Sequence, residues 1–338
     1  MKKIAVVTGG AGFIGSHMVD LLLSKGFKVK VIDNLTGGRK SNIVKNLKNK
    51  NFYFDKIDIC KINLDHSFFK SAKYVFHFAG IGDIVPSIEK PIDYIETNVN
   101  GTARILEASR RSKVKKFVYA ASSSCYGLAK TPTKENHKIN PLYPYALSKY
   151  LGEKLSFHWH ELYKMPVNSI RIFNAYGPRV RTTGVYGAVF GVFFKQKLSK
   201  QPYTVVGDGS QKRDFVYVTD VANAFLLAAT SKIKGEIFNV GAGKPQSINS
   251  LIKILKGKKV SVPRRPGEPH ITHANIQKIK RLLRWSPKVS FKKGVQIMLN
   301  DITKWKDAPL WRPNSINHAT KLWFNYMKKL TFAPALFK

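Results

Sequence analysis

A strand-like segment that runs directly into closely spaced glycines constrains the fold of this chain more than any other feature. Residues 4–8 are apolar and mostly β-branched, and Gly9, Gly12 and Gly15 follow them. Residues 16–23 then have helical spacing. Glycines in this pattern allow a tight turn, close approach of the backbone to a pyrophosphate, and close packing of the helix on the strand. The segment therefore predicts a strand-turn-helix unit that binds a dinucleotide.

An aspartate at the end of the next predicted strand narrows the choice of dinucleotide. Asp33 can accept hydrogen bonds from the two hydroxyls of a ribose, and its charge repels a 2′-phosphate. This favours NAD over NADP, although the neighbouring Arg39 and Lys40 weaken the preference. Asp58 and Ile59 follow a third apolar segment, and they either hold the edge of the adenine or belong to an ordinary loop.

Short β-branched runs alternate with amphipathic segments through the first half of the chain. This alternation is typical of an α/β fold with a doubly wound parallel Rossmann sheet. We expect strands at residues 4–8, 29–33, 74–78, 116–121 and 169–173, and crossover helices at residues 14–25, 92–112 and 144–163.

The second half of the chain has a different texture. After Asn174 it is rich in loops with glycine, proline and arginine, which indicates a smaller C-terminal α/β lobe. A length of 338 residues is at the usual upper limit for one core. We expect an NAD-binding Rossmann domain at residues 1–176, to which about 213–241 return. Residues 177–212 and 242–338 are expected to form the substrate-binding lobe and a tail whose aromatic part, residues 305–329, packs against the body.

The net charge of +38, from 58 basic and 20 acidic residues, raises the question of a nucleic-acid or membrane partner. Most basic residues are lysines spread along the chain without a long basic block, which indicates a solvated surface. We expect neither partner, although the positive field would attract an anionic substrate. Cys60 and Cys125 have neither disulfide nor metal-ligand spacing, so we expect a cytoplasmic protein without a bound metal.

A tyrosine and a lysine four residues apart form a candidate acid/base pair. Tyr145 and Lys149 fall on one face of the predicted helix at residues 144–163. An ammonium group stabilises a nearby phenolate, so we expect Lys149 to lower the pKa of Tyr145. Ser122 follows a predicted buried strand, and its hydroxyl can bond the same substrate oxygen. This placement argues against a chance pair on an exposed helix face.

Further motifs lie in order along the chain. They occupy residues 33–35, 58–59, 77–80, 98–102, 122–127, 171–179, 207–209, 213–215 and 264–268. With the glycine turn and the Tyr145/Lys149 pair, they resemble the extended short-chain dehydrogenases/reductases of the NAD-dependent epimerase/dehydratase family. Within that family the chain is most similar to the UDP-glucose and UDP-N-acetylglucosamine 4-epimerases. The similarity extends to about residue 295.

The resemblance implies a role for each matched position. Tyr145 would be the catalytic base, Lys149 its partner and the anchor of the nicotinamide ribose, and Ser122 the third member of the triad. The implied cofactor-binding residues are Gly9, Gly12, Phe13, Ile14, Gly15, Asp33, Asn34, Asp58, Ile59, Phe78, Ala79, Gly80, Asn98, Tyr145 and Lys149. The implied substrate-binding residues are Ser122, Ser124, Asn174, Arg213, Arg265 and Thr272.

Two arginines are expected to hold the diphosphate of a UDP-sugar. Forked guanidinium groups suit phosphate oxygens, and the resemblance assigns Arg213 and Arg265 to this role together with Asn174. For Arg213, an ion pair with Asp214 is the alternative. Thr272 matches a position that limits sugar size in some relatives, and its small side chain leaves both UDP-glucose and UDP-N-acetylglucosamine open.

The implied activity is the interconversion of UDP-hexose C4 epimers through a 4-keto intermediate, with NAD regenerated in each cycle. Related 4,6-dehydratases carry an Asp-Glu pair just after the position of Ser122, and decarboxylases carry a glutamate there. Ser123 and Ser124 stand at these positions, which favours epimerisation. Asp83 is expected to cap a loop, but it could also substitute as an acid/base.

Two other functions compete with this prediction. One is a different 4-keto-forming enzyme, such as a dehydratase or an enzyme that decarboxylates or epimerises UDP-glucuronate. The other is a non-catalytic protein that binds through its basic surface. Relatives dimerise through helices that match residues 92–112 and 144–163, so the resemblance also implies a homodimer.

Overall fold

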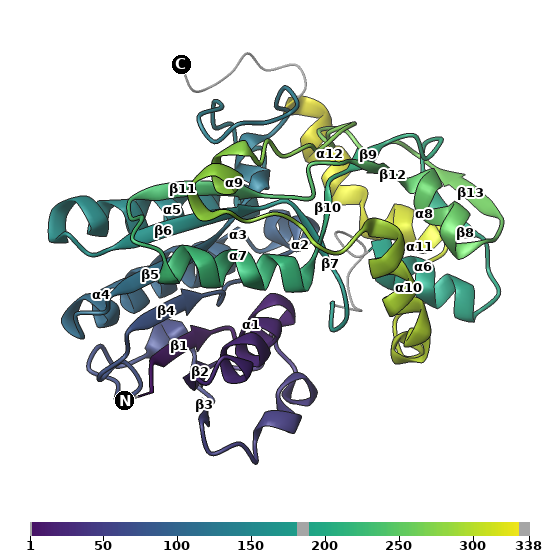
Figure 1. The fold of residues 1–338 in the computed structure, drawn as a ribbon. Coiled ribbons are helices and arrows are strands. Elements are labelled where there is room, and N and C mark those ends of the chain that lie inside the picture. The colour runs from purple at the N-terminus through teal and green to yellow at the C-terminus, as the bar shows by residue number, and fades with distance from the viewer. Residues whose placement is uncertain (1, 181–188, 331–338) are drawn as a thin grey trace.

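The computed structural model describes residues 2–180 and 189–330, and a seven-stranded parallel sheet lies at its centre (Figure 1). The strands follow the order β3-β2-β1-β4-β5-β6-β11. Five strands lie within two residues of their predicted positions: β1 (Ile4–Thr8), β2 (Lys28–Ile32), β4 (Tyr74–His77), β5 (Lys116–Ser122) and β6 (Val167–Ile172). The prediction of a doubly wound parallel sheet is therefore confirmed.

The strand order reverses between β1 and β4, which are neighbours in the sheet. The side chains that end these strands are bonded to each other, with Thr8 Oγ1 and His77 Nδ1 2.7 Å apart. In a doubly wound sheet, such a switch point opens a crevice outside the carboxyl ends of the strands. The turns that follow Thr8 and His77 therefore face the same crevice.

The two remaining strands complete the edges of the sheet. The apolar segment before Asp58 forms β3 (Phe52–Asp55), which pairs with β2. On the opposite edge, β11 (Glu236–Val240) pairs with β6. The later chain thus returns to the main sheet, since β11 is one of its strands and the helix α7 (Val218–Thr230) packs beside α1 on one face.

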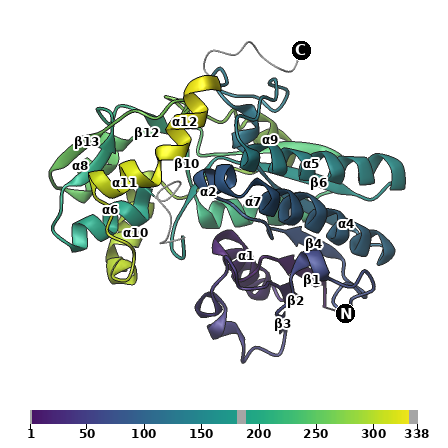
Figure 2. The ribbon, with the colours of Figure 1, turned by 180° about the vertical axis from the view of Figure 1, so that it is seen from behind.

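Helices cover both faces of the sheet (Figures 1 and 2). On one face, α1 (Phe13–Ser24) packs against α7 in a core that includes Met18, Leu22 and Phe225, all fully buried. On the other face, α4 (Thr102–Arg111) packs against α5 (Pro144–Tyr163), whose bounds match the prediction. The apolar residues of α4 recur along one face, so this helix is amphipathic and can bury that face against the sheet.

The single helix predicted at residues 92–112 is wrong in detail. The segment consists of α3 (Pro91–Ile95), a π-helical turn (Glu96–Gly101) and α4. A π-helical turn adds a residue per turn and often marks a functional position. Here it turns Asn98 toward the loop that follows β4, as described below.

We call a second group of elements, separate from the main sheet and the helices that cover it, the smaller lobe. It contains α6 (Val189–Leu198), β8 (Tyr203–Val206), β9 (Lys212–Arg213), β12 (Gln246–Ser247), α8 (Ile248–Leu255), β13 (Lys259–Val262) and α10 (Phe291–Asn300). The short pair β7 (Asn174–Tyr176) and β10 (Phe215–Tyr217) joins it to the sheet, and stacked rings fill its core, with Tyr176 and Phe190 5.0 Å apart. Residues 181–188 and 331–338 of the predicted lobe and tail lie outside the described residues.

The aromatic tail packs against the body, as predicted. It contains α11 (Pro313–Ala319) and α12 (Lys321–Leu330), and Figure 2 shows α11 beside α6 and α12 near α2 (Ile84–Glu89). Trp305 and Trp323 are buried, and Trp305 meets Phe194 edge-on at 4.8 Å. Within residues 2–180 and 189–330, no helix combines the length and apolar character needed to cross a bilayer.

Candidate active site

The turn between β1 and α1 has the close backbone contacts that its glycines predict. We call residues 9–15 the cofactor turn. Gly9 has a φ of +68°, and a Cβ there would lie 2.6 Å from the backbone nitrogen of Ala79. A Cβ on Gly15 would lie 2.1 Å from the carbonyl oxygen of Gly9. Only glycine fits at these two positions, so backbone atoms can approach an anionic group at the N-terminus of α1.

Asp33 fixes the shape of the cofactor turn and also lines the cavity beside it. One carboxylate oxygen accepts a hydrogen bond from the backbone N–H of Ala11 at 2.9 Å, and the other accepts one from Leu35 at 2.8 Å. Burial raises the pKa of Asp33, and these two bonds oppose the shift. Each oxygen keeps a lone pair, so the carboxylate can still accept a hydrogen bond from a ribose hydroxyl.

The adenine-side residues are linked to one another. The side-chain amide of Asn34 donates to Asp58 at 3.0 Å, and the backbone N–H of Cys60 donates to the other Asp58 oxygen at 2.8 Å. Asp58 and Ile59 line the cavity. This arrangement is compatible with either of the two predicted roles of Asp58.

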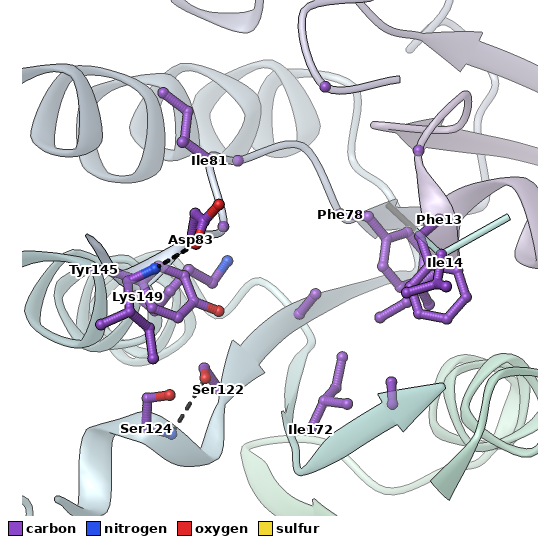
Figure 3. Close-up of a pocket in the computed structure, with 18 of the residues that line it drawn as sticks. Phe13, Ile14, Phe78, Ile81, Asp83, Ser122, Ser124, Tyr145, Lys149 and Ile172 are labelled. Carbon is purple, nitrogen blue, oxygen red and sulfur yellow. Dashed lines mark hydrogen bonds between the residues drawn. The ribbon is translucent and has the colours of Figure 1, made fainter. Parts of the chain in front are cut away.

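Ser122, Tyr145 and Lys149 come together although they belong to two elements. Ser122 ends β5, and Tyr145 and Lys149 lie one turn apart near the start of α5. Pro144 occupies the first turn of α5, where its missing N–H costs no helical hydrogen bond. In Figure 3 the Tyr145 ring lies between Asp83 and Ser122. The predicted triad is therefore assembled at one end of the cavity.

The pKa of Tyr145 differs from the expectation. Burial raises it, a hydrogen bond with Ser122 opposes the rise, and the negative charge of Asp83 adds to it. Burial also lowers the pKa of Lys149 to about 8, against the opposing charge of Glu153. Lys149 Nζ lies 4.6 Å from the centre of the Tyr119 ring. The expected lowering of the Tyr145 pKa is wrong for this structure, because desolvation outweighs the helical spacing.

Asn98 supports the cavity from behind rather than lining it. Its side chain is fully buried, accepts a hydrogen bond from the Ile81 N–H at 2.7 Å, and donates to the Ile81 carbonyl at 3.0 Å. It also donates to Ser148 Oγ at 2.9 Å. Asn98 thus ties the loop after β4 to α5, and its expected contact with the cofactor stays a prediction.

Asp83 caps a helix and also lines the cavity. Its side chain caps α2 by accepting a hydrogen bond from the Ile84 N–H at 3.0 Å, which confirms the expected capping role (Figure 3). It also lines the cavity, and its charge acts on Tyr145.

The two expected phosphate-binding arginines share one carboxylate. Glu268 Oε1 lies 2.5 Å from Arg213, and Glu268 Oε2 lies 3.9 Å from Arg265. The alternative pairing of Arg213 with Asp214 is wrong, because Asp214 instead accepts hydrogen bonds from the backbone N–H groups of residues 242, 243 and 274. Sequence reasoning assigned no role to Glu268, although it belongs to the motif at residues 264–268, which we call the arginine loop.

Thr272 is not among the residues that line the cavity. Its hydroxyl donates to the side-chain oxygen of Asn174 at 2.7 Å and accepts from the Asp214 N–H at 3.0 Å. Both contacts hold the hydroxyl behind Asn174. Thr272 thus supports Asn174, and the expected limit on sugar size at this position stays a prediction.

One continuous cavity of about 940 Å³ joins these groups. Its lining includes all the other residues expected in the site: Gly9, Gly12, Phe13, Ile14, Gly15, Asp33, Asn34, Asp58, Ile59, Phe78, Ala79, Gly80, Ser122, Ser124, Tyr145, Lys149, Asn174, Arg213 and Arg265. A volume of this size suits a dinucleotide and a second extended ligand side by side.

Known proteins match this arrangement. The model of the NAD dependent epimerase/dehydratase family matches residues 5–241. The chain belongs to this family. NAD is thus its cofactor, and the residues of the cofactor turn and Asp33 fit that group.

Relatives of this family member differ in their reactions. A putative UDP-glucose 4-epimerase of Methanocaldococcus jannaschii is 40% identical over 304 residues, which cover 87% of this chain and 97% of that protein. A UDP-N-acetyl-alpha-D-glucosaminuronate decarboxylase of Bacillus cytotoxicus is 34% identical, covering 88% of this chain and 96% of that protein. The crystal structure of a UDP-glucuronic acid 4-epimerase from Bacillus cereus, in complex with UDP-glucuronic acid and NAD, is 33% identical. It has a TM-score of 0.84 and covers 89% of this chain and 99% of that chain.

Proposed function

We propose that this protein is an NAD-dependent UDP-hexose 4-epimerase. The observation that carries the proposal is the set of groups around Tyr145: Ser122 bonded to it, Lys149 one turn along, and Ser123 and Ser124 in place of acids. These groups can oxidise and reduce an alcohol carbon. They include no carboxylate at the two positions that relatives use to eliminate water.

Tyr145 accepts the proton of the sugar 4-hydroxyl in this proposal, and Ser122 orients that hydroxyl. NAD, when bound, would supply the means to oxidise C4 and to reduce it again, with no second redox substrate. Loss of the hydroxyl proton and of the C4 hydride leaves a 4-keto sugar. When the sugar turns over, Tyr145 returns the proton to the oxygen as C4 is reduced on its other face, so no net oxidation occurs.

Lys149 has two roles in this scheme. Its ammonium group can bond the ribose next to the nicotinamide, and its positive charge favours the ionised form of Tyr145 once the substrate is bound. The lowered pKa of about 8 leaves Lys149 mostly protonated at neutral pH. The cofactor turn would hold the pyrophosphate, and Asp33 the adenosine ribose.

The diphosphate of the substrate would bind to Arg213 and Arg265 in the smaller lobe. Glu268 pairs with Arg213 at 2.5 Å and lies 3.9 Å from Arg265, which places forked donors for phosphate oxygens at one wall of the cavity. Asn174, supported by Thr272, offers a further amide at that wall. We thus propose that the smaller lobe selects the nucleotide, while the end of the cavity at Tyr145 holds the sugar.

A second candidate is a 4-keto-forming enzyme that eliminates or decarboxylates. One observation favours it: Asp83 lies at the cavity close enough for its charge to act on Tyr145. Its capping bond to Ile84 limits its freedom to move toward a substrate. Epimerisation needs no such group, and for that reason we rank it first.

The test is the product formed from a panel of UDP-sugars. Purified protein with NAD is incubated with UDP-glucose, UDP-N-acetylglucosamine and UDP-glucuronate, and the sugar signals are followed by NMR. The C4 epimer of at least one of these sugars is the expected product. A 4-keto-6-deoxy sugar or a pentose would contradict the proposal and support the second candidate.

A further inference from the structure

The tail of the chain lies beyond the motifs shared with the family, yet it reaches the active site. The last of those motifs lies at residues 264–268, whereas α11 and α12 follow at residues 313–330. Figure 2 shows these two helices running from the smaller lobe, beside α6, toward α2 of the sheet body. The tail therefore bridges the two sides of the cavity.

The first half of this bridge contributes to the cavity wall. Ile316 of α11 is buried and lines the cavity. Its carbonyl accepts a hydrogen bond from Thr320 Oγ1 at 2.8 Å. Just before α11, the carbonyl of Trp311 accepts a hydrogen bond from Gln196 at 2.8 Å, and Gln196 also holds the cavity-lining Thr204. The tail is thus fixed to the smaller lobe where it joins the wall.

The second half contacts the arginine loop. Trp323 Nε1 donates a hydrogen bond to the carbonyl of Pro266 at 2.8 Å, one residue after Arg265. Met327 packs on the next residue, since a Cβ on Gly267 would lie 2.4 Å from its terminal methyl. The side chains of Trp323 and Met327 are both buried. The backbone that carries Arg265 is therefore held by the tail.

The same tryptophan also contacts the catalytic side. Its ring lies 5.7 Å from the ring of Tyr143, and Tyr143 lies parallel to Tyr145, with ring centres 6.5 Å apart and planes 6° apart. Trp323, Val85 and Met327 form one buried cluster at this point, and the partly buried Tyr143 packs against it. A single side chain of the tail thus touches the supports of both Arg265 and Tyr145.

We propose that Trp323 is a positioning residue that sets the geometry between the diphosphate-binding arginine and the catalytic tyrosine. Its indole N–H fixes the arginine loop, and its ring fixes the Tyr143–Tyr145 stack. The site spans a sugar-nucleotide from its diphosphate to its sugar, so it needs both ends in place at once. This inference rests on the proposed function, because it assumes a substrate that reaches both ends.

Two substitutions separate the two contacts in the full-length protein. Trp323→Phe keeps an aromatic ring beside Tyr143 but loses the bond to Pro266. We expect the KM for the UDP-sugar and the Kd for UDP to rise about three- to tenfold, with kcat within about twofold of wild type. Trp323→Ala also removes the support of Tyr143, and kcat should then fall roughly ten- to a hundredfold.

Trp305→Phe is the matched control. Trp305 is an equally buried tryptophan of the tail that packs on Phe194, and its Nε1 has no hydrogen-bond partner among the described residues. Its substitution should leave KM, kcat and UDP affinity unchanged. The affinity for NAD is measured in every variant and should stay at the wild-type value, because Trp323 bonds Pro266 and packs on Tyr143, and neither of these residues belongs to the cofactor turn.

The readouts separate the two proposals. A wild-type protein that binds UDP but converts no UDP-sugar contradicts the proposed function, and the UDP affinities still test Trp323. Wild-type values of KM, kcat and UDP affinity in Trp323→Phe would overturn the role of Trp323 while leaving the epimerase intact. An equal loss of NAD affinity would also overturn it, since the effect would then be global. Trp323→Phe carries the test if Trp323→Ala does not fold.

Discussion

The cofactor turn and the arginine loop face one cavity, but different interactions hold each of them in shape. At the cofactor turn, Gly9 and Gly15 bring backbone against backbone, and Asp33 bonds two backbone N–H groups within 22 residues. At the arginine loop, Glu268 pairs with Arg213, which is 55 residues away in the sequence. Trp323 reaches Pro266 across 57 residues.

This difference indicates that the cofactor turn and the arginine loop suit different kinds of ligand. A shape made by the backbone accepts few substitutions, which suits a cofactor that stays the same through every cycle. A shape made by side chains from distant segments can change one residue at a time.

The largest effect is expected from removing the proton acceptor on the sheet side. Tyr145→Phe keeps the ring that stacks on Tyr143 but loses the hydroxyl, so kcat should fall by about 10²–10⁴-fold. The affinity for NAD should change little. Steady-state kinetics and an NAD titration check this, with Tyr163→Phe at the far end of α5 as the control. Near-normal turnover in Tyr145→Phe would mean that another group accepts the proton.

Gly15→Ala tests the backbone character of the cofactor turn. The added methyl would lie 2.1 Å from the Gly9 carbonyl oxygen, so the turn must open. We expect the affinity for NAD to fall at least about tenfold and the free energy of unfolding to fall by about 1–3 kcal/mol. Gly37→Ala puts the same methyl into open space at the same cavity and should keep far more of the affinity. Equal behaviour of the two variants would show that the turn tolerates side chains.

The cofactor turn and the catalytic residues, which the main sheet and its helices carry, were predicted well because their sequence signals are local. We call this part of the cavity the sheet side. The glycine spacing, the strand before it and the Tyr145/Lys149 pair each lie within one or two elements, and the structure assembles them as expected. The π-helical turn escaped prediction, since one extra residue hardly alters the apolar pattern on either side of it. The contact of Asn98 with Ile81 also escaped prediction, because Ile81 lies 17 residues earlier, with α2 and α3 between them.

The substrate side depends on contacts that no local pattern encodes. Arg213 chooses Glu268 over its neighbour Asp214, because Asp214 is held by three backbone N–H groups from two other loops. The direction of the Tyr145 pKa also escaped prediction, since spacing along a helix carries no information on burial. In both cases the missing quantity is the three-dimensional environment of a charge.

Arg265→Lys tests whether the arginine loop binds a diphosphate through a forked guanidinium group. Lysine keeps the charge but lacks the fork, so the KM for the UDP-sugar should rise about tenfold while kcat stays within about twofold. The neighbouring Arg264 is 69% exposed and pairs with Asp208 at the surface, so Arg264→Lys is a matched control that should leave KM unchanged. If both substitutions raise KM equally, general positive charge accounts for the binding and the side-chain geometry of this loop does not.

The smallest expected effect is on the pH dependence of the free energy of unfolding, and it comes from the burial of Lys149. Lys149 has a pKa of about 8 in the folded protein, below its ordinary value of 10.5, so above pH 8 the unfolded chain binds more protons at this residue than the folded one. The free energy of unfolding of wild type should therefore rise, relative to Lys149→Met, by about 1 kcal/mol between pH 7 and pH 9. Denaturant titrations at the two pH values measure it, and Lys154→Met, on the exposed face of α5, should give no such rise. A difference between wild type and Lys149→Met that is independent of pH would mean that water reaches Lys149.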